Sequence, residues 1–228
     1  MISNKSVVAV IPVRAGSQRV KNKNIRPFAG TSLLEIKVKQ MLRIKELDGV
    51  IVNSESDEML DLAKKLGAQP VKRDPYFASS TVPINEVYKN ICENTNSDII
   101  LYANATNPLL KDETVSNAIK TFEQAKKDGF DTLNSAHLVK EFMWRDGRPI
   151  NYDLENMPKS QNLPDIYALN FAMNIFERQY GIDNSSIVGK KPFLFNIDLV
   201  EATDIDNEID FDFAEFMYKK LFADNKSR

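Results

Sequence analysis

Apolar and polar positions along the chain change period in regular turns, and these changes predict an alternation of strands and helices. Residues 7–13 form a continuous apolar run, VVAVIPV, which is typical of a short strand buried on both faces of a parallel sheet. Residues 32–44 instead place apolar side chains at helical spacing among Lys, Gln and Arg. The same two patterns recur, with strands predicted at 49–53, 70–73 and 98–103 and helices at 57–66, 84–93 and 113–127. This order predicts a Rossmann-like α/β fold with a doubly wound, mainly parallel sheet.

Capping residues mark the ends of two of these predicted helices. Ser56 precedes the stretch DEMLDLAKKL as an N-cap, and Gly67 follows it as a stop. Asp112 is predicted to cap the next-but-one helix, which should end at Gly129.

The pattern changes after residue 131. A strand is predicted at 131–139, but the segment at about 140–166 is polar and is broken by Pro149, Pro158 and Pro164. We predict that this segment is an inserted arm. Regular patterns return at 167–176 and 193–199, and an amphipathic helix is predicted at 208–222. The whole chain, residues 1–228, is therefore expected to form a single domain that carries an arm.

Composition excludes several classes of protein. The 228 residues are 43% hydrophobic and carry Lys+Arg 30 against Asp+Glu 32, a formal net charge of -2, which argues against a nucleic-acid binder. No apolar run approaches the roughly 18 residues that a membrane span needs, and the first residues lead into strand-like sequence rather than a signal peptide, so we expect a cytoplasmic protein with no membrane partner. Cys92 and His137 are the only residues of their types, which excludes disulfides and cysteine- or histidine-rich metal sites.

Positive charge gathers directly after the first strand. Residues 11–25, IPVRAGSQRVKNKNI, contain two Arg and two Lys but no acid. In open α/β sheets, ligands bind beyond the carboxyl ends of the strands, where backbone N–H groups and cations can surround phosphates. The spacing matches neither GxxxxGK[ST] nor GxGxxG, so P-loop hydrolysis and dinucleotide binding are disfavoured. A nucleoside triphosphate site is one interpretation of this loop, and a solvated basic loop is the other.

A pair of acids forms the second candidate site. Asp204 and Asp206 are two residues apart, so in extended backbone they point to the same side. Two carboxylates with open water positions suit Mg²⁺, which also bridges substrate phosphates. The alternative is that Asp206 caps the last helix.

The basic loop resembles the signature loop of the CMP-acylneuraminate (sialic acid) synthetases, usually IPARGGSKGIPRKNI. The triplet at 17–19 is also similar to the S-x-R element of the more distant CMP-KDO synthetases. Matching stretches follow in the same order at 27–30 (PFAG), 52–58 (VNSESDE), 72–75 (KRDP), 106–109 (TNPL), 161–164 (QNLP) and 204–206 (DID). The resemblance thus covers nearly the whole chain, and it implies an enzyme that transfers CMP from CTP to an acidic 2-keto sugar with release of pyrophosphate.

The resemblance also implies roles for individual residues. Arg14, Lys23 and Asp206 correspond to catalytic positions, and Asp204 and Asp206 to the ligands of Mg²⁺. The implied nucleotide-binding residues are Ala15, Gly16, Ser17, Arg19, Asn24, Arg73, Ser80 and Thr81. The match at Ser80 and Thr81 is looser. Arg73, taken alone, is equally compatible with surface charge. The family uses its arm to form a homodimer, and we expect the same here.

The acceptor half departs from the family pattern. Where the family has Q-P-T-S-P-L-R, this chain begins with Asn104 and ends with Leu110, so a cation is lost. Asn170 and Phe171 replace Asn-Gly in the N-G-A-x-Y element, and Gln161 is kept. The reaction class is therefore predicted more firmly than the acceptor. We expect an acylneuraminate-type nine-carbon 2-keto acid, or a relative modified in its side chain, bound by Asn104, Gln161, Asn170 and Phe171. Two alternatives stay open: a nucleotidyltransferase of the same fold that acts on a sugar phosphate, and a non-catalytic nucleotide-binding relative.

Overall fold

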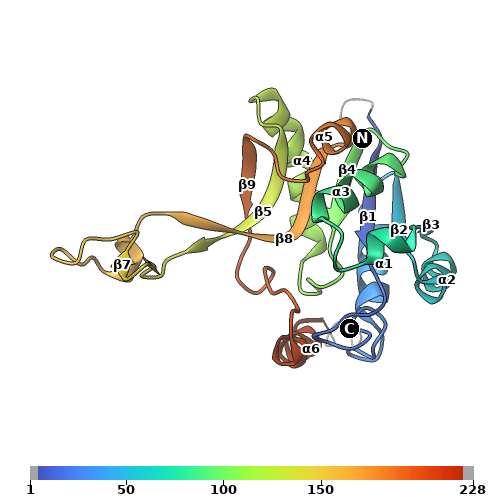
Figure 1. The fold of residues 1–228 in the computed structure, drawn as a ribbon, viewed down its shortest axis with the longest axis horizontal. Coiled ribbons are helices and arrows are strands. Elements are labelled where there is room, and N and C mark those ends of the chain that lie inside the picture. The colour runs from blue at the N-terminus through green and yellow to red at the C-terminus, as the bar shows by residue number, and fades with distance from the viewer. Residues whose placement is uncertain (1–4, 223–228) are drawn as a thin grey trace.

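The computed structural model, which describes residues 5–222, is built around a seven-stranded sheet in the order β3-β2-β1-β4-β8-β5-β9 (Figure 1). The strands are β1 (Val7–Pro12), β2 (Gly49–Ser54), β3 (Gln69–Lys72), β4 (Ile99–Ala103), β5 (Thr132–Val139), β8 (Ile166–Glu177) and β9 (Pro192–Asn196). Only β8 among these runs antiparallel to its neighbours, and the other pairings are parallel. The predicted mainly parallel α/β fold is confirmed.

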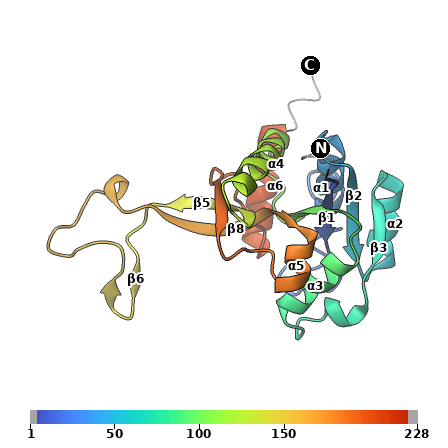
Figure 2. The ribbon, with the colours of Figure 1, turned by 90° about the horizontal axis from the view of Figure 1, so that it is seen from above.

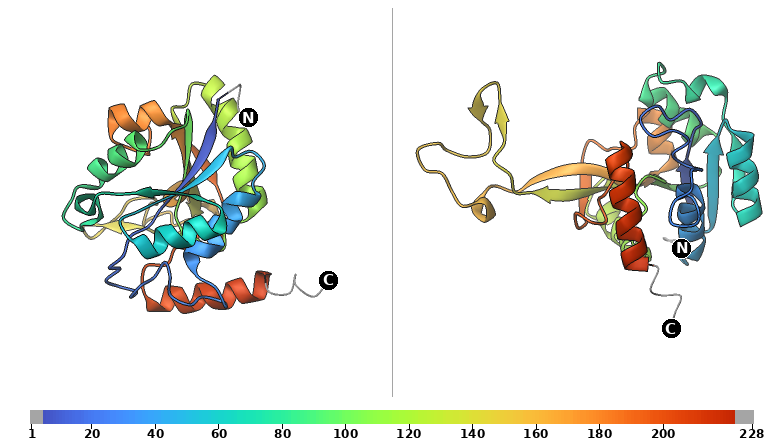
Figure 3. Two further views of the ribbon diagram at one scale, coloured as in Figure 1. Left: turned by 90° about the vertical axis from the view of Figure 1, so that its right-hand side faces the viewer. Right: turned by 90° about the horizontal axis from the view of Figure 1, so that it is seen from below.

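Helices cover both faces of the sheet (Figure 3). One face packs against α1 (Leu33–Arg43), α2 (Asp57–Leu66) and α4 (Asp112–Lys127). The other packs against α3 (Ile84–Glu93) and α5 (Arg178–Asn184). None of the helices among residues 5–222 combines the length and the apolar character that crossing a membrane requires.

Local signals account for both ends of α2, but not for the start of α4. The Ser56 side chain accepts a hydrogen bond from the Met59 amide at 3.4 Å, and Gly67 ends α2 in the left-handed conformation with φ +96°, both as predicted. The prediction for Asp112 is wrong, because this residue is the first of α4 and Lys111 occupies the N-cap position. The Asp112 carboxylate instead accepts hydrogen bonds from Arg43 at 2.7 and 3.0 Å, and this bidentate pair joins α4 to α1.

The only cysteine, Cys92, lies where two helices approach closely. It is buried in α3, and a Cβ added to Gly181 of α5 would lie 2.5 Å from its sulfur. Burial raises the pKa of the Cys92 thiol to about 12. Cys92 therefore serves as a small buried hydrophobic side chain, and its thiol is poorly reactive at neutral pH.

The final helix, α6 (Glu208–Phe222), lies below the carboxyl ends of the central strands (Figure 1). Phe211 of this helix packs edge-on against Phe28, with ring centroids 5.2 Å apart, and the guanidinium of Arg26 lies 4.4 Å from the Phe211 ring centroid. This small cluster joins α6 to the basic loop and to α1. It therefore places the chain just before α6 beside that loop.

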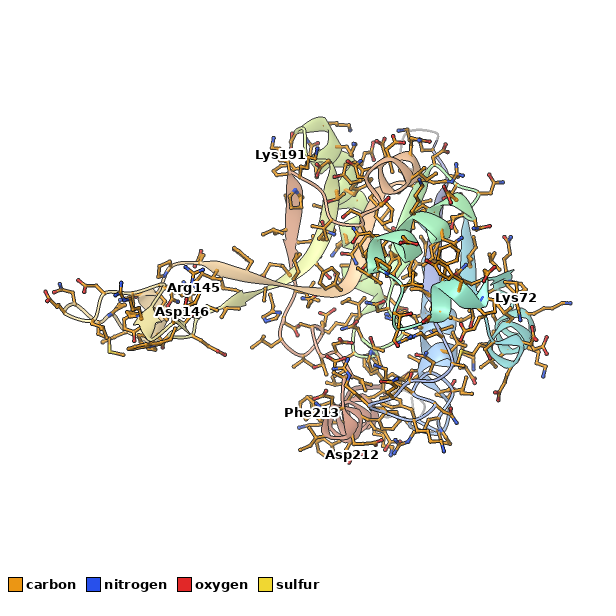
Figure 4. All side chains as sticks on the ribbon, in the orientation of Figure 1. Lys72, Arg145, Asp146, Lys191, Asp212 and Phe213 are labelled. Atoms are coloured by element: carbon orange, nitrogen blue, oxygen red, sulfur yellow. The ribbon has the colours of Figure 1, made fainter. Side chains whose placement is uncertain are left out.

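The arm projects from the body as a long extension of β5 and β8 (Figures 1 and 2). It carries the short pair β6 (Trp144–Arg145) and β7 (Arg148–Pro149) and the 3-10 helix η2 (Ser160–Asn162). Arg145 and Asp146 lie on this projecting part (Figure 4). Buried Asn151 organises it by accepting from the Met143 amide at 2.9 Å and donating to the Glu141 carbonyl at 2.8 Å. Large apolar side chains are nevertheless exposed on it: Trp144, Ile150, Leu154 and Met157.

An irregularity in β8 lies beside the end of β4. Asn174 pairs with Asn134 of β5, but the next paired residue, Leu169, lies opposite Ala136, so β8 bulges between them. Within the bulge Phe171 has φ +54°, a backbone conformation that favours glycine. The family pattern that the sequence resembles has Gly at this position, and glycine adopts this conformation without the strain that a phenylalanine side chain imposes.

Candidate active site

A cavity of about 570 Å³ opens at the carboxyl ends of β1, β3 and β4. The basic loop, the residues after β3 and β4, and the segment before α6 contribute to its walls. It contains many of the predicted site residues: Arg14, Ser17, Arg19, Lys23, Asn24, Arg73, Ser80, Asn104 and Asp206. One wall is apolar and includes Phe77, Val82, Ile84, Val87 and Tyr102. The fold thus gathers residues far apart in the sequence at the edge where α/β sheets bind ligands.

Other predicted residues lie outside the lining of this cavity. Ala15 and Gly16 are in the basic loop and Thr81 follows η1 (Pro75–Ala78), but their side chains or Cα atoms do not line it. Asp204 is also outside the lining, two residues from Asp206.

The predicted acceptor residues are divided. Asn104 lines the cavity and donates a hydrogen bond to the Phe171 carbonyl at 2.9 Å, so the bulge of β8 is tied to the cavity wall. Asn170 faces the sheet instead, accepting from the Ser135 hydroxyl at 2.6 Å. Gln161 is exposed in η2 on the projecting arm, outside the lining of this chain's own cavity.

The basic loop is folded back on itself by two residues in the left-handed region. Gly16 has φ +72° and Asn22 has φ +54°, and the Asn22 carbonyl accepts from the amides of Ile25 and Arg26 at 3.0 and 2.8 Å. The Asn24 side chain donates to the Arg14 carbonyl at 3.2 Å and links the two ends of the loop. In this conformation three of the loop's four cations, Arg14, Arg19 and Lys23, line the same cavity.

Each cation of the cavity that comes from the loop has a protein partner. Arg14 donates to the Ala78 carbonyl at 2.7 Å, and Lys23 donates to the Ile205 carbonyl. Arg19 forms a 2.7 Å ion pair with Asp206. Burial lowers the pKa of Lys23, while the neighbouring acids, Asp204 above all, oppose this shift. Carbonyls and a half-exposed ion pair are weak partners compared with phosphate, so a polyanion could take these donors over.

Glu55, a residue that the sequence did not single out, anchors the start of the loop. Its carboxylate accepts from the Ala15 amide at 2.7 Å and from the Arg73 guanidinium at 3.3 Å. Arg73 is buried, being 4% exposed, and also donates to the Val13 carbonyl at 2.5 Å. Glu55 directly follows β2. An acid at the end of a strand opposite a basic loop was therefore the sequence signal from which its role could have been predicted. Because the Ala15 amide is occupied, Glu55 shapes the loop from behind.

Asp204 and Asp206 lie in an irregular segment held by the loop after β4. The Ile205 amide donates to the Thr106 carbonyl and the Asn107 side chain to the Thr203 carbonyl, both at 3.0 Å. Partial desolvation raises the pKa of Asp204, a shift that a hydrogen bond with Thr106 opposes and the charge of Asp206 reinforces.

The alternative role of Asp206 as the cap of α6 is taken by its neighbours. The Asn207 side chain accepts from the amides of Ile209 and Asp210 at 3.0 and 3.1 Å, and the Asp210 carboxylate accepts from the amides of Asp206 and Asn207 at 2.9 Å. The Asp206 carboxylate is therefore available to the cavity.

The donor set fits a hard divalent cation. Two carboxylates from Asp204 and Asp206 and the nearby Thr106 hydroxyl are oxygen ligands of the kind that Mg²⁺ prefers. Residues 5–222 contain no cluster of three or more His, Cys, Asp or Glu that could enclose a metal on their own. Mg²⁺ keeps several waters and shares its remaining positions with substrate phosphates, so a protein that binds it needs to supply only one or two carboxylates.

A family model and several known proteins match this chain, and they point to the same family. Residues 8–183 match the model of a family described as cytidylyltransferase. The chain is 28% identical to the post-translational flagellin modification protein B of Campylobacter coli, covering 94% of this chain and 95% of that protein. It is 27% identical to the CMP-N,N'-diacetyllegionaminic acid synthase of Campylobacter jejuni, with coverage of 92% and 94%. It is 26% identical to a pseudaminic acid cytidylyltransferase of Campylobacter jejuni, with coverage of 93% and 96%.

Solved structures share the fold. A CMP:2-keto-3-deoxy-manno-octonic acid synthetase complexed with CTP aligns with a TM-score of 0.67 at 10% identity, over 95% of this chain and 100% of that one. A 4-diphosphocytidyl-2C-methyl-D-erythritol synthase from Anaerococcus prevotii aligns with a TM-score of 0.70 at 15% identity, over 96% and 98%.

Replacing Glu55 by Gln should destabilise the protein through the buried Arg73. The amide keeps one acceptor but removes the charge that balances the guanidinium, and breaking a buried ion pair from one side costs about 2 kcal/mol or more. Urea unfolding measures the loss. Asp57→Asn is the matched control, because Asp57 pairs with Lys72 in solvent, with side-chain exposures of 85% and 50%. Equal unfolding free energies for the two variants would contradict the anchoring role of Glu55.

Proposed function

The chain belongs to the cytidylyltransferase family, and we propose that it transfers CMP from CTP to an acidic 2-keto sugar of the acylneuraminate type, releasing pyrophosphate. The observation that carries this proposal is the convergence of Arg14, Arg19 and Lys23 with Asp206 around one cavity at the carboxyl ends of the strands. Cations can receive a triphosphate there, and the carboxylate can receive the metal that accompanies it.

In the proposed reaction the anomeric hydroxyl oxygen of the sugar forms a bond to the α-phosphorus of CTP. The bond from that phosphorus to the oxygen bridging the α- and β-phosphates breaks, pyrophosphate leaves with this electron pair, and the hydroxyl proton passes to solvent or a nearby base. Negative charge grows on the leaving group, so catalysis depends mainly on positioned cations.

Residues in the cavity and directly behind it have different proposed roles in this reaction. Arg14 and Lys23 exchange their carbonyl partners for phosphate oxygens, and Arg19 exchanges Asp206 for the same anion. Asn24 and Glu55 keep the loop in shape, and Gly16 and Ser17 allow close approach of its backbone. Asp204 and Asp206 would hold Mg²⁺, which supplies charge neutralisation at the phosphates.

The acceptor is proposed to bind on the β4–β8 side of the cavity, where Asn104 meets the bulge at Phe171. The relatives act, by their names, on legionaminic, pseudaminic and acylneuraminic acids, all nine-carbon sugar acids. We propose an acceptor of this class, made into a CMP-activated sugar for surface glycans in the cytoplasm. Gln161 lies on the arm outside its own cavity, so its proposed contact with the acceptor would be made in the cavity of a second copy, in a homodimer joined through the arm.

A matrix of nucleotides and acceptors tests the proposed function. Pyrophosphate release is expected with CTP and nine-carbon 2-keto acids, and mass spectrometry should find the corresponding CMP-sugar. Pyrophosphate release only with a phosphorylated acceptor would show that the proposed class of acceptor is wrong. Binding of CTP with no turnover on any acceptor of the panel would identify a non-catalytic relative.

Replacing Lys23 by Met should lower kcat strongly while the protein stays folded. The substitution keeps the length of the side chain but removes a cation from the leaving group, a change that typically lowers kcat by about 10²–10³-fold. Lys72→Met is the matched control: Lys72 is exposed, pairs with Asp57 in solvent and lies outside the cavity lining, so its loss should leave kcat unchanged. Similar kcat values for both variants would remove Lys23 from the catalytic set.

A further inference from the structure

A wholly buried lysine lies behind the cavity, on α1. Lys37 has no exposed surface, and its ammonium group has no carboxylate within hydrogen-bond distance among the contacts of residues 5–222. The Nζ atom donates to the Gln40 side-chain oxygen at 2.8 Å and to the Asn107 carbonyl at 3.0 Å. A cation in this place is expensive, and an apolar side chain of similar length would often be more stable. The lysine therefore needs an explanation other than core packing.

The two hydrogen bonds of Lys37 lead to one turn. Gln40, which is also buried, donates to the Leu110 carbonyl at 2.5 Å. Lys37 and Gln40 thus hold the first and last residues of the 107–110 turn from the same helix. This turn follows β4, and Leu110 occupies the position at which the family pattern has Arg.

The 107–110 turn and the residue before it hold the segment that carries Asp204 and Asp206. Asn107 is fully buried, and its side chain donates to the Thr203 carbonyl at 3.0 Å. Thr106, next to it, accepts from the Ile205 amide at 3.0 Å and bonds the Asp204 carboxylate. A continuous chain of contacts therefore runs from Lys37 through Asn107 to the 203–206 segment.

We propose that Lys37 is a positioning residue, which fixes the 203–206 segment through Asn107 and so sets the places of the Asp204 and Asp206 carboxylates. This inference rests on the proposed function in assigning those carboxylates to Mg²⁺. Lys37 acts at a distance, since it touches neither carboxylate and lies outside the cavity lining. No pattern in the sequence indicates this role, because a lysine in an amphipathic helix is normally on the solvent face.

The hydrogen bonds suit the neutral form of the side chain. Burial lowers the pKa of Lys37 to about 7, against a weaker opposing effect of Asp112, and a neutral amine has two N–H groups for its two acceptors. Since the ordinary pKa is 10.5, the unfolded chain binds this proton between pH 7 and 10.5 while the folded chain does not. Stability from this group therefore rises with pH across that window and levels off below it.

The pH dependence gives one prediction. Between pH 7 and pH 9, the unfolding free energy of the wild type should increase relative to that of Lys37→Met, which has nothing to titrate at this site. Urea unfolding of both proteins at the two pH values measures the difference. A difference that stays constant, or that moves in the opposite direction, would show that Lys37 is charged in the fold.

The positioning role is tested by hydrogen exchange and by metal dependence in the full-length protein. In Lys37→Met the amides of the 203–206 segment, Ile205 in particular, should exchange at least 10-fold faster than in the wild type. The Mg²⁺ concentration for half-maximal CMP transfer should rise at least 5-fold, with little change in KM for CTP. Lys39→Met is the matched control, because Lys39 is two residues away in the same helix but is exposed and pairs with Glu35; it should match the wild type in both measurements.

Unchanged exchange in a folded Lys37→Met protein would overturn the proposal. Should that variant fail to fold, Asn107→Ser provides the second measurement, because it keeps the carbonyl that Lys37 binds and removes the bond to Thr203; unchanged exchange there would equally overturn it. Exchange is measured without substrate, so it succeeds or fails independently of the proposed reaction. Faster exchange in Lys37→Met, together with a wild type that transfers no CMP, would refute the proposed function and leave the structural link intact.

Discussion

The structure depends on bringing several positively charged side chains close together at one edge of the sheet. Cations at the ends of neighbouring strands repel one another, and in a partly buried cavity that repulsion is screened poorly. Three cations of the loop each have a weakly bound partner in the folded chain: a carbonyl for Arg14 and for Lys23, and a carboxylate for Arg19. Such partners offset the repulsion between the cations and bind them less strongly than phosphate would.

Two acids serve this arrangement in different ways. Glu55 is enclosed with Arg73 and shapes the loop from behind, so its charge belongs to the scaffold. Asp206 is half-exposed and faces the cavity, so its ion pair with Arg19 can be exchanged. The difference in solvent exposure separates an enclosed carboxylate that holds the loop from one that is open to the cavity, although both are bonded to arginine.

Local chemistry made much of this molecule predictable, and tertiary contacts set the rest. The apolar runs and the caps at Ser56 and Gly67 depend on neighbours in sequence, so the strands and helices of the first half were predicted closely. Asp112 was assigned as a cap because its competing partner, Arg43, is distant in sequence. The bulge at Phe171, the anchor at Glu55 and the buried Lys37 each depend on residues more than fifteen positions away, and no periodicity records such contacts. The basic loop was recognisable because its charge and its glycine lie in one short stretch.

The burial of Cys92 has a practical consequence for studies of the arm. A thiol enclosed between two helices, with its pKa raised to about 12, reacts slowly with maleimides at neutral pH. Any cysteine introduced on the surface would then be the one readily labelled position in the natural background. Fluorophores or spin labels could be attached at chosen points on the projecting ribbon, and distances between labelled copies in solution would follow directly from spectroscopy.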